Sequence, residues 1–244
     1  ASNVENDGSI LTTSGTTALA AGSGFTVDYE QDGKINLEVN TSAAGANVLN
    51  AGTIKADGGY VLMTARDASK TLNTVVKNTG IIEAKSLKSV NGTIILDGGE
   101  QGTVEVGGSL DASGTGDGET GGTIKITGQY TNVTGSLNAQ GNTAGGYIET
   151  SGDVLSFGDD FTVDASALNG TNGTWSLDPL LVVIGDSSNT DGTSVVTGNH
   201  SVAATYTDDG KGTYDFSLTD THKYNDYYGY SSNYTTSYIS AATI

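Results

Sequence analysis

A segment that recurs every 26 to 28 residues constrains the fold of this chain more than any other feature. In each copy a large apolar residue is followed two positions later by alanine. The copies begin at Ile54, Ile82, Leu110, Leu137 and Val163. An earlier member that lacks the alanine, Ile10-Leu11-Thr12, lies 44 residues before the first copy. A fixed period of this size is the sequence signature of a repeat architecture.

Two further β-prone segments recur in step with the first. The second type opens with glycine, and its copies start at Gly59, Gly92, Gly122, Gly146 and Gly173. The third type is represented by residues 103–106, 130–134 and 153–157. The order is always second, third, first and then a polar loop. The loops vary in length and the segments do not, as expected when loops leave a stack of strands at its corners.

This pattern predicts an all-β fold, a parallel β-helix with three short strands per coil. Strands of successive coils would pair in parallel, and alternation along each strand would send every second side chain inward. An antiparallel sandwich or barrel gives no reason for a constant register of three distinguishable strand types. In the coil at 121–141 the residues predicted to point inward are Ile124, Ile126, Val133, Leu137 and Ala139.

Two segments depart from the repeat. Residues 65–78 place Ala68, Leu72, Val75 and Val76 at helical spacing. We predict a short helix there, with an irregular strand as the alternative. The repeat ends near Ile184, so we expect a β-helix over 1–185 and a separate extra-helical or capping segment, rich in Tyr, Asp, Ser and Thr, over 186–244.

The composition limits the class of partner. The net charge is −18, and the chain has no cysteine. A surface of this sign repels phosphate backbones and anionic headgroups, so we expect no nucleic-acid partner. Without cysteine the chain can form neither disulfides nor thiolate metal sites. No apolar run reaches the roughly 18 residues that span a bilayer.

The combination of residues 50–87 (NAGTIKADGGYVLMTARDASKTLNTVVKNTGIIEAKSL), 145–152 (GGYIETSG) and 173–179 (GTWSLDP) resembles the filamentous-haemagglutinin-like adhesins of two-partner secretion. The resemblance covers about residues 1–185. It implies a right-handed β-helix, secretion to the bacterial cell surface, and an outer-membrane transporter as a partner. The family's secretion domain carries an Asn-Pro-Asn motif, and no Asn-Pro occurs here. We therefore expect a segment downstream of that domain, with the transporter acting through a region outside this chain.

The candidates for a catalytic role are three acidic residues on or beside strands, Asp97, Asp111 and Asp164. Polysaccharide-degrading enzymes need clustered carboxylates on one exposed face. Asp97 belongs to a different strand type from the other two, and basic neighbours are scarce. His200 and His222 lie in the C-terminal segment, outside any known catalytic motif. We expect no enzyme activity.

Acid-rich loops at 116–119 and 158–160 leave a weak calcium site as an alternative to solvated turns, and we expect no cofactor otherwise. Neither loop fits the spacing of an EF-hand or of the glycine-rich calcium repeat. Asn-x-Ser/Thr sequons occur at Asn40, Asn91, Asn132, Asn169, Asn172, Asn199 and Asn233. The sequence leaves their modification open.

Tyrosines gather near the C-terminus. Tyrosine offers apolar area together with a hydroxyl, which suits contact with sugars or protein surfaces. The alternative, which we favour, is that these rings pack on the β-helix or cap its end, where an open sheet edge invites pairing. The candidate residues are Tyr224, Tyr227, Tyr228, Tyr230, Tyr234 and Tyr238.

The sequence thus predicts a non-enzymatic adhesin segment that is secreted to the bacterial surface. Its partner would be a glycan or protein of a host or neighbouring cell. The first alternative is an extracellular matrix or filament protein that self-associates end to end. The second is a β-helix enzyme that degrades polysaccharides.

Overall fold

The chain is all-β in the computed structural model, which describes residues 1–29, 35–68, 74–88 and 90–184 and the strands 195–197, 202–208, 214–219 and 239–240. No helix occurs in these residues. The strands up to Ile184 form parallel sheets that surround a common core in a solenoid-like arrangement, with one antiparallel hairpin outside them. We divide the stacked strands into three columns and call one strand from each column a coil.

The first column is a six-stranded parallel sheet. Its members are three residues long, and the central apolar residue of each lies opposite that of its neighbour. The aligned residues are Ile10, Ile54, Ile82, Leu110, Leu137 and Val163. The strands are β2 (Ser9–Leu11), β7 (Thr53–Lys55), β10 (Ile81–Glu83), β13 (Ser109–Asp111), β16 (Ser136–Asn138) and β18 (Thr162–Asp164). The sequence prediction of this alignment, including its first member, is confirmed.

The second column contains the glycine-opened strands. In it Val61, Ile94, Ile124, Ile148 and Trp175 are aligned across parallel neighbours. Its strands are β3 (Thr16–Ala21), β8 (Tyr60–Ala65), β11 (Thr93–Asp97), β14 (Thr123–Thr127) and the first halves of β17 (Tyr147–Phe157) and β19 (Thr174–Ile184).

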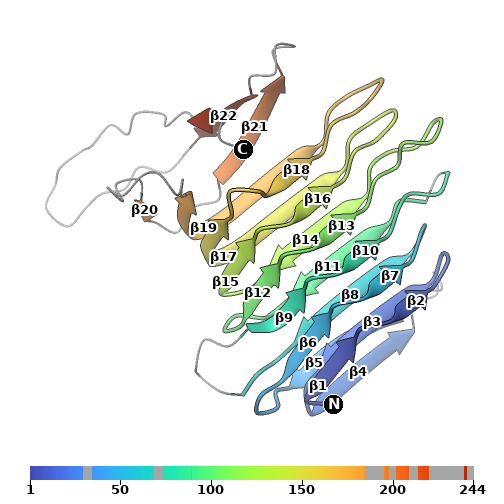
Figure 1. Ribbon diagram of the computed structural model, residues 1–244, viewed down its shortest axis with the longest axis vertical. Coiled ribbons are helices and arrows are strands. Elements are labelled where there is room, and N and C mark those ends of the chain that lie inside the picture. The colour runs from blue at the N-terminus through green and yellow to red at the C-terminus, as the bar shows by residue number, and fades with distance from the viewer. Residues whose placement is uncertain are drawn as a thin grey trace, which may run out of the picture.

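The third column pairs the remaining strands in parallel. They are β1 (Asn3–Asn6), β6 (Asn47–Asn50), β9 (Thr74–Asn78), β12 (Thr103–Val106), β15 (Tyr130–Val133) and the second halves of β17 and β19. Because β17 continues from the second column into the third, the two columns join into one sheet. Figure 1 shows the coils stacked from the blue N-terminal strands to the orange strands β18 and β19.

The core lies between the three columns. The five residues predicted to point inward in the coil at 121–141 are all buried, with exposed fractions of 0–1%. Ala56, Ala84, Ala112 and Ala139, which follow the first-column strands, are fully buried as well. Only a small side chain fits at that corner because the strands converge there.

A column of glycines sets the spacing at the corner between the third and first columns. A methyl group added to Gly80 would overlap the carbonyl oxygen of Gly52, one coil earlier. The same relation joins Gly52 to Gly8, Gly108 to Gly80 and Gly135 to Gly108. The backbones approach so closely at this corner that no side chain can be accommodated.

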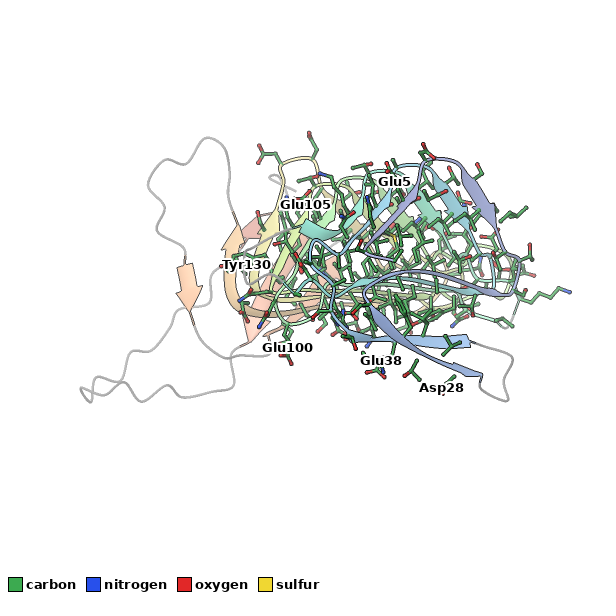
Figure 2. All side chains as sticks on the ribbon, turned by 90° about the horizontal axis from the view of Figure 1, so that it is seen from below. Glu5, Asp28, Glu38, Glu100, Glu105 and Tyr130 are labelled. Atoms are coloured by element: carbon green, nitrogen blue, oxygen red, sulfur yellow. The ribbon has the colours of Figure 1, made fainter. Side chains whose placement is uncertain are left out.

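The long gap before the first full repeat contains an inserted hairpin. Strands β4 (Gly24–Tyr29) and β5 (Ile35–Thr41) pair with each other in antiparallel fashion, between β3 and β6 in the chain. Figure 2, seen along the stack from below, shows the hairpin on one side of the sheets with Asp28 and Glu38, and Glu5 and Glu105 on the opposite side. The insertion leaves the register of the coils unchanged.

The predicted helix over 65–78 is wrong where the structure describes that segment. Residues 74–78 form strand β9, and β8 extends to Ala65. Residues 69–73 lie outside the described residues. A bulge explains the helical spacing, because the pairing of β12 with β9 passes from Thr74 to Val76. Val75 and Val76 are both buried, so two adjacent apolar residues point into the core.

Beyond Ile184 the pairing changes direction. Strand β19 pairs in antiparallel fashion with β20 (Val195–Thr197) and β21 (Val202–Asp208). Strand β22 (Tyr214–Thr219) pairs with β21, and β23 (Ile239–Ser240) pairs with β22. Residues 185–194 lie outside the described residues, so the predicted division at residue 185 and the separate nature of residues 186–244 stay predictions.

Candidate functional site

The tyrosine candidates lie outside the described residues. This applies to Tyr224, Tyr227, Tyr228, Tyr230, Tyr234 and Tyr238, and equally to His200 and His222. Their proposed roles therefore stay predictions. The surface that can be analysed is the outer side of the three columns and the loops between them.

The acidic residues considered for catalysis are not brought together. Asp97 lies on β11 in the second column, whereas Asp111 and Asp164 lie on β13 and β18 in the first. Asn138 separates these last two in their row, so they are two strand spacings, about 10 Å, apart. The structure therefore does not gather the three carboxylates into one cluster.

Asp97 forms an ion pair with Arg66. The Arg66 Nη2 atom lies 2.6 Å from its Oδ2 atom, and the Thr64 hydroxyl donates to the same oxygen at 3.2 Å. Its other oxygen accepts a hydrogen bond from the Gly99 amide. The Asp97 side chain is thus held in place by contacts with three residues.

The outer side of the first column carries a ladder of alternating charges. The Lys55 Nζ atom lies 2.8 Å from Glu83 and 3.1 Å from Asp57. The Lys85 Nζ atom lies 3.2 Å from Asp111 and 3.4 Å from Glu83. Each lysine thus bridges neighbouring coils, and the five residues form one network.

The network shifts the pKa of both lysines upward. Hydrogen bonds to Glu83 and Asp57, reinforced by their charges, raise the pKa of Lys55. Burial lowers the pKa of Lys85, but its contacts with Asp111 and Glu83 outweigh burial and raise the pKa overall. Both amines are therefore fully protonated at neutral pH and cannot act as bases or nucleophiles.

The second column carries a smaller cluster around Glu149. The Lys125 Nζ atom lies 3.0 Å from Glu149, and the hydroxyls of Tyr147 and Ser151 donate to its carboxylate. Burial raises the pKa of Glu149, but the partners, Lys125 foremost, outweigh burial and lower the pKa overall. Lys125 also lies over the Tyr147 ring, 5.7 Å from its centroid. Tyr60, on the same side of this column, has its pKa raised by burial and by the charge of Asp97.

The loop at 116–119 is closed by its own glutamate. The Glu119 carboxylate accepts hydrogen bonds from the amides of Gly116 and Lys88, at 2.9 and 3.0 Å. In the loop at 158–160, Asp159 and Asp160 are exposed. Across the described part of the chain, no group of three or more His, Asp or Glu residues could hold a metal ion. The alternative of a weak calcium site thus gains no support from these residues.

The sequons in the described part of the chain lie at the surface. Asn40 is exposed in the hairpin, and Asn132 is half-buried on β15. Asn91, Asn169 and Asn172 lie in the loops that join the first column to the second, and all three are exposed. Asn199 and Asn233 lie outside the described residues.

An interior asparagine ladder was missed by the sequence analysis. The Asn6 side-chain amide donates to the Asn50 Oδ1 atom at 2.7 Å, and Asn50 donates to the Asn78 Oδ1 atom at the same distance. Asn50 and Asn78 are fully buried. The signal was available, because each asparagine lies two residues before a glycine of the corner column (Gly8, Gly52 and Gly80).

An aromatic cluster fills the core near β19. The ring centroids of Phe157 and Phe161 lie 4.8 Å apart, and Trp175 meets Phe157 edge to face at 5.4 Å. The Trp175 indole donates to the Thr150 hydroxyl at 3.2 Å. Phe157, Phe161 and the asparagine ladder are buried and Trp175 is partly buried against the core, so both groups serve packing.

In a comparison with known proteins, no protein-family model and no curated sequence matches the chain. Over the described residues, no helix has the length and apolar character needed to cross a membrane.

Proposed function

We propose that the chain is a right-handed parallel β-helix and forms part of a secreted, non-enzymatic adhesin of the filamentous-haemagglutinin-like kind. The observation that carries the proposal is the alignment of like residues through successive coils. Isoleucine, leucine or valine in the first column, alanine after it and glycine before it recur in register. Such columns suit the extension of a stack of coils.

The charged groups on the outer side support a structural role. Among the described residues, the carboxylates of Asp97, Glu105, Glu83 and Glu149 each have a cation within 3.0 Å, and each of these pairs joins neighbouring coils. Pairs of this kind neutralise charge along the rod. In this proposal the rod presents loops, or the segment 186–244, to a glycan or protein on another cell.

Partners and location follow from the same proposal. The protein would be extracellular at the bacterial surface, carried there by an outer-membrane transporter that reads a region outside this chain. The net charge of −18 disfavours nucleic acid as a partner. Specificity would then come from hydrogen bonds and ring stacking.

The test is binding to a glycan array and to cultured epithelial cells, using the chain and a variant without residues 186–244. The intact chain should bind a restricted set of glycans or a cell-surface protein, and loss of binding in the variant would place the contact in the C-terminal segment. Absence of binding by both proteins, together with product release from a polysaccharide panel, would replace the proposal with the enzymatic alternative.

One observation favours self-association as a second candidate. Within the described residues, β1, β2 and β3 each pair on one side only, which leaves three parallel edges at the same end of the stack. At the other end, β19 is paired by antiparallel strands. Electron microscopy over a range of concentrations would distinguish the two, since regular fibres that lengthen with concentration support the matrix role and persistent single rods exclude it.

A further inference from the structure

Three tripeptides of identical sequence place the same chemistry in three different surroundings. Asn-Gly-Thr occurs at 91–93, 169–171 and 172–174. In Asn-Gly, the glycine amide nitrogen can attack the side-chain carbonyl carbon of asparagine, because glycine has no Cβ to obstruct the approach. Since the glycine and threonine that follow are the same in all three, a large difference in their reactivities has to come from the folded structure.

Two hydrogen bonds hinder this reaction at Asn172. Its Oδ1 atom accepts a hydrogen bond from the Ala167 amide at 2.9 Å. The attacking group is held as well, because the Gly173 amide donates to the Ala165 carbonyl at 2.7 Å. Both reacting groups must leave a hydrogen bond before they can meet.

Asn91 occupies the equivalent corner three coils earlier, before strand β11 in place of β19. The Thr120 hydroxyl donates to its Oδ1 atom at 2.9 Å. Gly92 is buried against the Ala84 carbonyl group. The carboxamide is thus fixed, and the attacking nitrogen belongs to a buried glycine.

Asn169 differs from both. Its side chain is exposed, and its own amide donates to the Asn142 carbonyl at 2.8 Å, which fixes the backbone on the N-terminal side of the reacting groups. Among the described residues, neither its carboxamide nor the Gly170 amide takes part in a hydrogen bond. Gly170 is exposed too.

We infer that Asn169 is a site of spontaneous deamidation in the folded protein. The Gly170 amide nitrogen loses its proton and forms a bond to the Asn169 Cγ atom. The Cγ–Nδ2 bond then breaks, and Nδ2 takes up a proton and leaves as ammonia. Water then opens the resulting succinimide at either carbonyl, which gives aspartate or isoaspartate. No reactant other than water is required.

The product changes the loop in two ways. Either form adds a negative charge and removes the asparagine of the sequon at 169–171. Isoaspartate also adds a methylene group to the main chain, between the amide bonded to Asn142 and the bridge that joins Thr171 to Ala144. The short parallel contact of this loop with the preceding coil is then out of register.

The test is incubation of the folded chain at mildly alkaline pH, followed by peptide mass spectrometry that quantifies aspartate and isoaspartate at each site. Asn169 should react about tenfold faster than Asn172, or more, because opening the two hydrogen bonds at Asn172 slows that site by roughly this factor. Asn91 should also react slowly. In concentrated urea the three rates should converge, since the sequences are the same.

Two variants complete the design. Asn169→Gln should abolish most isoaspartate formation in the folded chain, and Asn172→Gln should leave it unchanged. Equal rates at the three sites in the folded protein, or a faster rate at Asn172 or Asn91, would overturn the inference. A rate ratio that persists in urea would do the same, because the difference would then not come from the fold.

Discussion

Asn50 donates its side-chain amide to the Asn78 Oδ1 atom at 2.7 Å, and both residues are fully buried. It also accepts the amide of Asn6, so it is the central member of a three-residue ladder. In the next coils the row continues with Val106 and Val133. The row therefore changes from polar to apolar without a change of backbone path.

Asn50→Val should destabilise the fold strongly, because it leaves the Asn6 donor and the Asn78 acceptor without their partner. An unsatisfied buried polar group costs about 1–3 kcal/mol, so the free energy of unfolding should fall by roughly 2–5 kcal/mol in urea titrations. The triple change of Asn6, Asn50 and Asn78 to valine should cost less than the single change. A triple variant less stable than Asn50→Val would contradict this account.

The glycine corner offers a matched pair of substitutions. Gly108→Ala should lower the free energy of unfolding by about 1–3 kcal/mol, because the methyl group overlaps the Gly80 carbonyl. At the adjacent Gly107, an added methyl group meets no atom closer than 3.5 Å. Gly107→Ala should therefore stay within about 0.5 kcal/mol of the native chain. Equal effects at the two positions would show that the corner is looser than described.

The Glu149 cluster predicts a pH dependence of stability. Because the pKa of Glu149 is lower in the folded chain than in the unfolded chain, its ionised form stabilises the fold above the unfolded pKa. That stabilisation is lost as the pH falls through the folded pKa. Unfolding free energies of the native chain and Glu149→Gln should differ near neutral pH and converge in acid. A difference that is constant with pH would exclude this role.

The charge ladder of the first column should contribute little to stability. The side chains of Lys55 and Lys85 are 42% and 38% exposed, so water screens their ion pairs. Lys85→Met should lower the free energy of unfolding by at most about 1 kcal/mol at low salt, and by less at high salt. A loss well above this range, or one unaffected by salt, would mean that packing of the lysine stem dominates.

The aromatic cluster provides a fluorescence reporter of the end of the stack at β19. Phe161→Ala should cost roughly 3–5 kcal/mol, because the ring is 6% exposed and contacts both Phe157 and Trp175. The emission of Trp175, the single tryptophan in the chain, should shift to longer wavelength as water reaches it. An unchanged emission spectrum would contradict the packing of these rings.

The sequence was most informative where one residue type occupies the same position in every coil. In the first column, the sequence predicted which Ile, Leu and Val residues lie opposite one another in neighbouring coils, with alanine after them. Strand β9 was missed because its bulge turns Val75 and Val76 to the same side, which imitates helical spacing. Strands β1 and β6 were missed because each ends inward with asparagine, a residue that predicts a turn and a solvated side chain.

The candidate site was predicted less well than the fold. The sequence indicated correctly that Asp97 lies apart from Asp111 and Asp164. It could not show that Asp97 meets Arg66, or that Lys85 lies between Glu83 and Asp111, because these contacts join residues on different strands. Such partners can be predicted only when the register of the coils is known residue by residue.

The inserted hairpin β4–β5 has a consequence for how such a chain can change. Its segment lengthens the path between β3 and β6, yet β2 and β7 still align residue for residue. The glycine corner gives no comparable freedom, since its backbone is already at the limit of contact. Evolution can therefore add insertions on one side of the stack without changing the spacing between coils.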